Sequence, residues 1–349
     1  MLRATALRPA VIRVPRPWGR RELRPLFPGS SELAEPIGEV WLTSREAPIE
    51  QGPWQGVALN TAWRQMPADW KGHRLAAEAD FPLLIKFLFT GAFLSVQVHP
   101  DDEWATQLEG PAARGKTEMW YVVQAAPGAE VRVGIPAALT REQFLDAVSR
   151  GTVAECLLRW TVQAGDTIFI PAGTFHTGGP GLVLCEIQQY ADITYRVFDF
   201  HRTGPDGHPR ELHLEKAMQV GRFGVQQGGL LSPVELPCTA GQRRLLVSCR
   251  YFAAEAWALQ QAYARRTRAA SMEALVVLSG QGQLEWADAS VAVERGQCWL
   301  LPASLGPYRL LPSPMLTLLR ISAESPESWL EEFPEEHGLR ERVARIMFS

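Results

Sequence analysis

Several features that would assign a chain to a specialised class are scarce or missing in this sequence. No apolar run approaches the ~20 residues that a helix needs to cross a bilayer, so no membrane span is predicted. The net charge of -3 at pH 7 leaves no excess of basic residues to attract nucleic acid or an acidic membrane surface. We therefore expect neither nucleic acid nor a membrane as a partner.

Cysteine is also scarce, and its spacing is irregular. An odd number of cysteines without a C-x-x-C motif favours reduced thiols that pack as small apolar side chains over a disulfide framework. The five residues are Cys156, Cys185, Cys238, Cys249 and Cys298. This usage predicts a cytoplasmic protein.

What the sequence does contain is a long series of short strand-like runs separated by glycine and proline. At 349 residues the chain is long enough for two domains with separate cores. The rhythm favours a mostly β fold of sandwich or barrel type over βαβ units. The runs are 83–90, 93–99, 118–124, 130–135, 167–171, 182–189 and 193–200, then 243–249, 273–279, 282–286, 289–293, 297–301 and 316–321.

One segment interrupts the series of strands. From Thr140 the sequence has a capping-box start and apolar residues at helical spacing, which predicts a helical insertion at about 140–160. Residues 232–242 contain two prolines and few strand formers, which is typical of a linker. The predicted units are an N-terminal domain at 1–235, a second domain at 241–323 and a helical tail at 324–349.

The second domain repeats parts of the first in weakened form. The run that begins at Glu273 resembles the run that begins at Glu118. Where the first domain has His176, the second has Pro307. Since proline offers no ligand atom, we expect the second domain to be a degenerate, metal-free copy.

Two histidines, a glutamate and a glutamine form the most informative pattern. Gln97 and His99 lie on one face of a strand-like run, Glu118 starts another, and His176 follows a Pro-Ala-Gly turn. Two imidazoles, a carboxylate and an amide oxygen suit a borderline divalent ion with open coordination positions. A neutral amide is a poor ligand, so Gln97 has orientation of substrate or water as its alternative role. The pattern predicts a catalytic metal site.

These residues lie within phrases that occur in the same order in type I mannose-6-phosphate isomerases (phosphomannose isomerases). The chain resembles the short bacterial form of that family over about residues 10–220 and more weakly beyond. The phrases are LLIKF from 83, SVQVHPDD from 95, GKTEMW from 115, IPAG from 170, EIQQ from 186, TYR from 194 and RELH from 210. Residues 15–23 resemble the Trp-Gly segment near the family's start, so the arginine-rich N-terminus is interpreted as part of the fold and not as a transit peptide.

The resemblance implies a fold, a reaction and a set of active-site residues. The fold is two cupin-like β-barrels of jelly-roll type, and the cofactor is one zinc ion per chain. The reaction interconverts D-mannose 6-phosphate and D-fructose 6-phosphate through a cis-enediol(ate). Arg196 matches an active-site arginine suited to stabilising an oxyanion. Lys116, Lys86 and Glu186 are further catalytic candidates, and the general base stays open between them and a water on the metal; either lysine would need a lowered pKa.

Two other functions are compatible with the same ligands. A His₂-carboxylate set in a small β-barrel also describes non-haem Fe(II) dioxygenases, although lysines and an arginine do not suit their apolar substrates. A non-catalytic sugar-phosphate binder is the other alternative. Changes from the family's usual residues at Phe175, Thr177 and Ala191 leave the substrate preference open.

Several polar residues near the motifs have competing interpretations. Arg202, Arg210 and His213 are candidates for a phosphate site, with solvated surface as the alternative. Asp101 and Asp102 are interpreted as a turn after Pro100. A sugar phosphate is the predicted partner, and the chain is expected to be a monomer or a homodimer.

Overall fold

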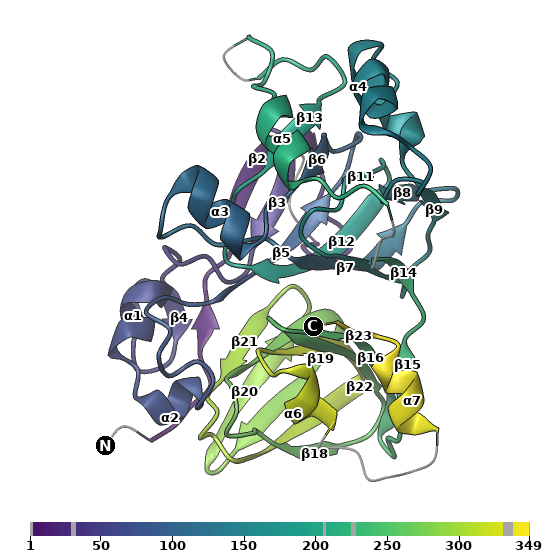
Figure 1. The fold of residues 1–349 in the computed structure, drawn as a ribbon. Helices are drawn as coiled ribbons and strands as arrows, with labels where there is room; N and C mark the ends of the chain where they lie inside the picture. The colour runs from purple at the N-terminus through teal and green to yellow at the C-terminus, as the bar shows by residue number, and fades with distance from the viewer. Residues whose placement is uncertain (1–2, 29–32, 205–206, 225–227, 331–337, 349) are drawn as a thin grey trace.

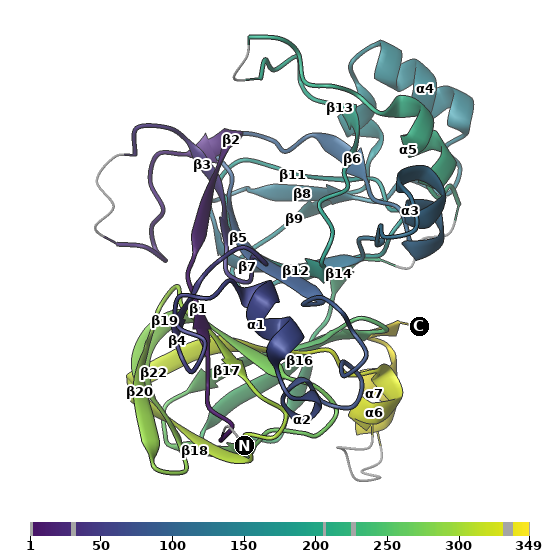
Figure 2. The same cartoon turned by 90° about the vertical axis from the view of Figure 1, so that its left-hand side faces the viewer.

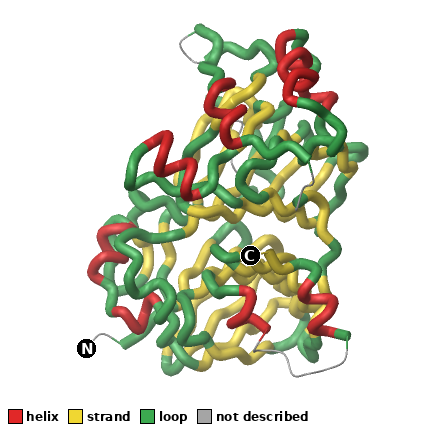
Figure 3. The backbone as a smooth tube through the Cα atoms, in the orientation of Figure 1, coloured by secondary structure: helices red, strands yellow, loops and turns green. Residues whose placement is uncertain are grey.

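Short apolar strands build two β-rich halves, which lie one above the other in Figure 1. The computed structural model describes residues 3–28, 33–204, 207–224, 228–330 and 338–348. The helices lie at the periphery of both halves, as Figure 3 shows. The predicted mostly β architecture is confirmed.

The first half consists of two sheets that face each other. The larger has the order β14-β10-β7-β12-β5-β3-β2 and the smaller β13-β6-β11-β8-β9. The larger sheet contains β2 (Ile12–Arg20), β3 (Ile37–Trp41), β5 (Leu83–Phe89), β7 (Glu118–Ala125), β10 (Thr167–Ile170), β12 (Leu182–Gln189) and β14 (Gly229–Leu231). The smaller contains β6 (Val96–Val98), β8 (Glu130–Val133), β9 (Arg159–Thr161), β11 (His176–Gly178) and β13 (Tyr195–Phe198).

The two sheets enclose an apolar core at one end and leave polar side chains at the other. Leu88, Trp120 and Ile168 of the larger sheet pack with Val131 and Val133 of the smaller one. Every strand predicted in this half is present, although the strand predicted at 93–99 is ordered as β6 only from Val96 to Val98. The alternation of side chains along these strands decides which ones face the space between the sheets.

Helices cover the far edge of the first half. The predicted insertion forms α4 (Arg141–Ser149) and the 3₁₀ turn η1 (Val153–Cys156), and Thr140 makes both hydrogen bonds of a capping box with Gln143. The apolar face of α4 packs beside α5 (Leu214–Val220) in a shared cluster. The sequence analysis did not predict α1 (Leu59–Gln65), α2 (Ala68–Lys71), α3 (Asp102–Glu109) or α5.

The second half is one continuous group of strands. Its path is β15-β16-β17-β22-β19-β20, with β18 paired to β22, β21 to β19 and β23 to β16. The strands are β15 (Val234–Leu236), β16 (Gly241–Cys249), β17 (Ala253–Leu259), β18 (Tyr263–Arg266), β19 (Glu273–Trp286), β20 (Ala289–Glu294), β21 (Cys298–Leu301), β22 (Pro307–Ser322) and β23 (Met347–Phe348).

Three details of this half differ from the sequence predictions. The segment predicted as a linker, 232–242, contains β15, which pairs with β16. The runs 273–279 and 282–286 belong to one long strand, β19. The sequence analysis did not predict β17 or β18.

The predicted tail contains two short helices. They are α6 (Pro326–Leu330) and α7 (Leu339–Ala344). Residues 331–337 and 349 of the predicted tail lie outside the described residues.

The two halves share apolar contacts and are joined by backbone hydrogen bonds. Leu7 and Leu300 exchange two backbone hydrogen bonds of 2.9 and 2.8 Å, so the first residues of the chain lie against the second half, as Figure 2 shows. Beside them β1 (Arg8–Pro9) pairs with β4 (Ile49–Gln51). Phe87 and Phe89 of β5 belong to the same buried cluster as Leu246 and Leu319 of the second half. A single core therefore crosses the boundary.

The internal repeat is visible in the strand register. Glu118 at the start of β7 pairs with Ile170 at the end of β10. Glu273 at the start of β19 pairs in the same way with Leu301 at the end of β21. The two glutamates therefore hold corresponding positions in the two halves.

One cross-strand ion pair occurs in both halves, but with the positions of the acid and the base exchanged. In the first half Glu186 of β12 lies opposite Lys86 of β5, and in the second Arg320 of β22 lies opposite Glu255 of β17. Arg320 is 1% exposed; its Nη1 donates to Glu255 at 2.8 Å and its Nη2 to Glu273 at 2.6 Å. In the second half Glu273, the counterpart of Glu118, is thus neutralised by a guanidinium.

Among the described residues, no helix combines the length and apolar character needed to cross a membrane. The five cysteines are all free thiols, and three of them are buried.

Candidate active site

The predicted metal ligands converge from both sheets at the polar end of the first half. Gln97 on β6 and His176 on β11 are paired in register on the smaller sheet. Glu118 faces them from the start of β7 on the larger sheet, and His99 follows the end of β6 by one residue. All four side chains are buried.

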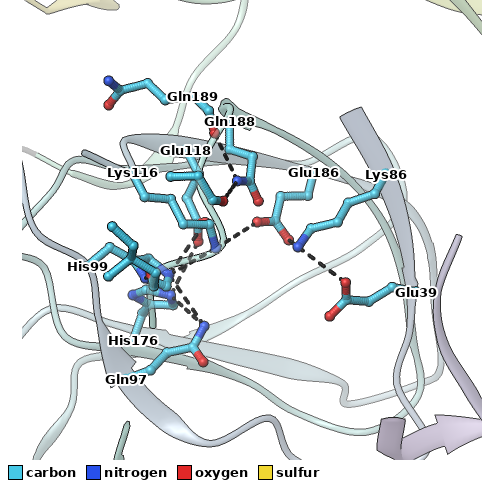
Figure 4. A network of polar contacts seen from close by, with 12 residues as sticks. Glu39, Lys86, Gln97, His99, Lys116, Glu118, His176, Glu186, Gln188 and Gln189 are labelled. Carbon is cyan, nitrogen blue, oxygen red and sulfur yellow. Dashed lines mark hydrogen bonds and ion pairs between the residues drawn. The ribbon is translucent and has the colours of Figure 1, made fainter. Parts of the chain in front are cut away.

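Three of these residues present their ligand atoms to one point. The ligand atoms of His99, Glu118 and His176 lie within 4.8 Å of one another, and among the described residues they form the one group of three or more such side chains. His176 Nε2 is 3.2 Å from Glu118 Oε1, and His99 Nε2 is 3.6 Å from Glu118 Oε2. The two imidazole rings are tilted by 52° with centroids 4.9 Å apart, and Figure 4 shows them beside the carboxylate.

The other nitrogen of each histidine is occupied. His99 Nδ1 lies 2.8 Å from the carbonyl of Ile193, and His176 Nδ1 lies 2.8 Å from that of Thr174. A carbonyl only accepts, so each Nδ1 is protonated and each Nε2 lone pair points toward Glu118. Burial, helped by the charge of Lys116, holds the pKa of His99 well below its usual range, which keeps this imidazole neutral.

The carboxylate of Glu118 is also left with free ligand capacity. Burial by itself raises the pKa of Glu118, but Lys116 and the two imidazoles outweigh it and hold the pKa well below its usual range. Neither oxygen receives a hydrogen bond of good geometry, although Lys116 Nζ lies 2.8 Å from Oε2. A buried anion with two free oxygens beside two imidazole lone pairs fits a divalent cation.

Gln97 completes the set through its side-chain amide. Its Nε2 lies 3.2 Å from His176 Nε2 and 3.5 Å from His99 Nε2, while its Oε1 accepts from Ser95 Oγ at 3.0 Å. Turning the amide by 180° places the oxygen between the imidazoles and lets the nitrogen donate to Ser95. In that orientation the amide oxygen faces the two imidazole nitrogens.

Lysines and carboxylates alternate along the larger sheet next to these ligands. Lys116 Nζ lies 3.2 Å from Glu186 Oε1, and Lys86 Nζ lies 3.6 Å from Glu186 Oε2. Lys86 Nζ also contacts Glu39 Oε2 at 3.4 Å, so the row ends on a further carboxylate, as Figure 4 shows. All of these side chains are buried.

The two carboxyl groups beside Lys86 have pKa values shifted in opposite directions. Burial and the charge of Glu118 raise the pKa of Glu186 to about 8 against the effect of the two lysines. Burial also acts to raise the pKa of Glu39, but Lys86 and Arg16 outweigh it and lower the pKa to about 2. The lowered pKa that a basic Lys116 would need is not observed: burial lowers it, but Glu118 and Glu186 together raise it above its usual value.

These groups line a cavity of ≈ 640 Å³ that opens between the two sheets. Five of the residues singled out in the sequence, Gln97, Lys116, Lys86, Glu186 and Arg196, border it. Arg196 on β13 is paired in register with Gln97, so its side chain emerges on the same face of the sheet. Its Nη1 donates to the carbonyl of Glu211 at 3.0 Å, while its Nε is buried without an acceptor.

The phosphate candidates separate into two groups. Arg210 and His213 line the cavity, and Arg202 does not. Arg202 instead lies beside Asp199, to which Arg210 Nε also donates at 2.7 Å. Lys216 of α5 is a further cation on the cavity wall.

Two other polar residues near the motif have structural contacts. Asp101 accepts a hydrogen bond of 2.9 Å from Trp104 N and caps α3, so the predicted turn is the start of a helix. Asp102 accepts from Gly115 N at 2.8 Å. Trp120 packs edge-on against the ring of His176 with a centroid separation of 5.5 Å.

The sequence analysis missed Glu39 and Arg16. Arg16 Nε donates to Glu39 Oε1 at 2.8 Å, and Trp41 Nε1 donates to Glu39 Oε2 at 2.6 Å. The sequence feature that could have identified Glu39 is that it is the one acidic residue in the otherwise apolar strand β3. A buried lysine such as Lys86 needs a carboxylate nearby, and Glu39 was the unassigned acid in a buried strand.

The fold and the site define a class: a two-part, mostly β protein of cupin type, with a buried His₂-Glu group beside a cavity lined by lysines, arginines and carboxylates. Comparison with known proteins agrees. The sequence profile of "Phosphomannose isomerase type I, catalytic domain" matches residues 18–119, and that of "Mannose-6-phosphate isomerase, cupin domain" matches residues 242–314. The chain belongs to the type I mannose-6-phosphate isomerase family.

Individual relatives support this placement over most of the chain. A mannose-6-phosphate isomerase of Streptococcus mutans is 32% identical over 292 residues, which cover 82% of this chain and 89% of that protein. A mannose-6-phosphate isomerase of Bacillus subtilis is 30% identical over 312 residues, which cover 84% and 91%. The crystal structure of the mannose 6-phosphate isomerase from Bacillus subtilis superposes with a TM-score of 0.82 at 27% identity, covering 90% of this chain and 99% of that one.

Proposed function

We propose that this chain is a zinc-dependent aldose–ketose isomerase that interconverts D-mannose 6-phosphate and D-fructose 6-phosphate. The observation that carries the proposal is the buried His99–Glu118–His176 group beside the cavity that Lys116, Lys86 and Arg196 line. Lys116 connects the two, because its Nζ lies 2.8 Å from Glu118 Oε2 and 3.1 Å from His99 Nε2. A dioxygenase pocket for apolar substrates would not need this row of buried charges. Family membership supports the same reaction.

The metal site would hold one zinc ion per chain. His99, Glu118 and His176 would be its ligands, with the amide oxygen of Gln97 as the fourth. When bound, zinc supplies a Lewis acid that polarises the oxygens on C1 and C2 of the sugar. The carbonyls of Ile193 and Thr174 fix both imidazole rings in the tautomer needed for ligation.

The remaining chemistry is assigned to the side chains along the cavity. Glu186 in its ionised form would remove the proton from C2 of the open-chain aldose and deliver it to C1, with a cis-enediolate between the two steps. The proton of the C2 hydroxyl would pass to the oxygen on C1, so that C2 becomes the carbonyl carbon of the ketose. Arg196 would donate to the substrate oxygen on which negative charge develops. Lys116 and Lys86 contact both oxygens of Glu186, so they fix the orientation of the carboxyl group.

The phosphate group would be bound at the mouth of the cavity. Arg210, His213 and Lys216 line this part of the wall. Arg210 is held by Asp199 and Lys216 by Glu109, at 2.7 Å in each case, so both cations are positioned before substrate arrives.

The remaining proposals concern architecture and context. We infer that each half is a cupin-like barrel of jelly-roll type, and that the second is a degenerate, metal-free copy. The free thiols are consistent with a cytoplasmic location. The assignment to monomer or homodimer stays a prediction.

The test is a coupled assay with mannose 6-phosphate on protein of known metal content. Activity should disappear after chelator treatment and return when zinc is restored. If zinc-loaded protein gives no turnover but binds mannose 6-phosphate, the protein is a binder and not an isomerase. Oxygen uptake with Fe(II) in place of zinc would favour a dioxygenase.

A further inference from the structure

A second cavity of ≈ 390 Å³ lies where the two halves meet. Four arginines border it, and only two carboxylates, those of Glu78 and Asp102, oppose them. The arginines are Arg45, Arg74, Arg114 and Arg250. A pocket with this excess of guanidinium groups attracts anions.

Two of these arginines are held by backbone carbonyls, and Arg45 also lies 3.6 Å from the carboxylate of Asp80. Arg45 donates through Nε and Nη2 to the carbonyl of Phe81 at 3.0 and 2.8 Å, and its guanidinium stacks 3.9 Å above the ring of Tyr190. Arg74 Nε donates to the carbonyl of Ala323 at 2.9 Å. Carbonyl oxygens position a guanidinium without cancelling its charge, so both cations are preorganised for an anionic ligand. Asp80 offsets part of the charge of Arg45, but it is shared with Arg64, to which it lies closer at 2.7 Å.

The other two arginines bring further charge to the same space. Within the described part of the chain, neither Arg114 nor Arg250 has a carboxylate at ion-pair distance. Arg45 and Arg114 of the first half border the same cavity as Arg250 of the second. Arg74 Nη2 donates to the backbone carbonyl of Arg250 at 3.3 Å and thereby joins the two halves at this pocket.

One wall of the pocket holds the backbone next to a predicted active-site lysine. Asp102 Oδ1 accepts from Gly115 N at 2.8 Å and from Gln189 Nε2 at 3.0 Å, and its Oδ2 accepts from Tyr251 OH at 2.8 Å. Gln189 Oε1 accepts from Thr117 N at 2.9 Å. Both neighbours of Lys116 are therefore tied to Asp102 or Gln189, and Figure 4 shows Gln189 directed away from the metal ligands.

We propose that this interdomain pocket binds a small phosphorylated anion, and that the bound anion acts on the active site through the backbone on either side of Lys116. Arginine pairs recognise phosphate oxygens through parallel hydrogen bonds. The volume lies within the range of small-molecule sites. A ligand held by residues of both halves would also fix the angle at which the second half meets the first.

The first claim, that the pocket binds an anion, is tested by calorimetric titration of the whole protein with inorganic phosphate. The double variant Arg114→Gln/Arg250→Gln should lose one equivalent of bound phosphate or bind it at least tenfold more weakly. The control Arg13→Gln/Arg266→Gln removes the same charge from exposed strand positions outside the pocket and should bind as the wild type does. Identical isotherms for the two double variants would overturn the proposal.

The second claim, that the bound anion acts on the active site, is tested by steady-state kinetics with mannose 6-phosphate. In the wild type, phosphate should change kcat as well as the apparent KM, because it acts at a second site. In Arg114→Gln/Arg250→Gln it should change only KM, through competition at the active site. Pure competition in both proteins would refute the coupling. The titration needs no turnover, so its outcome is independent of the proposed isomerase activity.

Discussion

One lysine, Lys86, lies between two carboxyl groups whose proton affinities differ by several orders of magnitude. Glu39 has a pKa of about 2 and Glu186 a pKa of about 8, although both are buried and both contact Lys86. Each carboxyl group has two cations beside it, Lys86 and Arg16 for Glu39 and Lys86 and Lys116 for Glu186. The difference arises because Glu186 also lies near the anion Glu118, whereas Glu39 accepts hydrogen bonds from Arg16 and Trp41. Glu39 is therefore a permanent anion, and Glu186 is a group able to exchange a proton.

The depressed pKa of Glu39 makes a prediction about acid stability. Its folded-state pKa is about 2 and its ordinary value is 4.5, so its contribution to stability is complete above pH 4.5 and is lost as the pH falls toward 2. Between pH 6 and 3 the free energy of unfolding of the wild type should fall about 2 kcal/mol further than that of Glu39→Gln. Urea unfolding at each pH measures this, and parallel curves for the two proteins would contradict it.

Arg196 makes a prediction about catalysis. Because it lies beside Gln97 but outside the His₂-Glu group, Arg196→Ala should retain its zinc while losing ~10²–10³-fold in kcat. Metal analysis and steady-state assays on the same sample check both parts. Near-native turnover with normal zinc content would show that the arginine has no role in the reaction.

At the scale of a single strand, β22 supplies the arginine that neutralises the buried carboxylates of the second half. Its Arg320 donates to Glu255 and Glu273 and lies 3.6 Å from Glu324, and all four side chains are buried. Removing one partner of a buried ion network leaves the remaining charges without compensation, and this costs more than the network gains over apolar packing.

Arg320→Met should therefore lower the free energy of unfolding by about 3–5 kcal/mol. The matched control is Arg309→Met on the same strand, where the side chain is 58% exposed and contacts Glu285 at 3.6 Å. That change should stay within about 0.5 kcal/mol, since an exposed ion pair contributes little. Equal effects of the two substitutions in chemical denaturation would show that the buried network does not hold this half together.

At the scale of the whole molecule, the shared core predicts that the two halves unfold together. Calorimetry should show one thermal transition, because Phe89 and Leu319 belong to one buried cluster that crosses the boundary. Phe89→Ala and Leu319→Ala, one in each half, should each lower the midpoint of that same transition, at about 2–5 kcal/mol of stability. Two resolved transitions, each sensitive to only one substitution, would contradict this expectation.

The sequence alone predicted what depends on local pattern. Strand alternation placed Gln97 and His99 on one face, and the capping box at Thr140 marked the start of α4. Contacts between distant residues were not predictable in this way. Glu39 lies 47 positions before Lys86, and no periodicity connects them. The short helices α1 and α2 have no side-chain cap and are held by the burial of their tryptophans, which is a tertiary effect.

The guanidinium of Arg320 has a consequence for how the enzyme responds to its surroundings. An ion that neutralises a buried carboxylate must be drawn from the medium and can be taken away again, whereas an arginine is supplied with the chain at synthesis. Glu273, the counterpart of Glu118, therefore keeps its cation when metal is scarce. Loss of a metal ion from the His99–Glu118–His176 group would therefore leave the charge balance inside the second half unchanged.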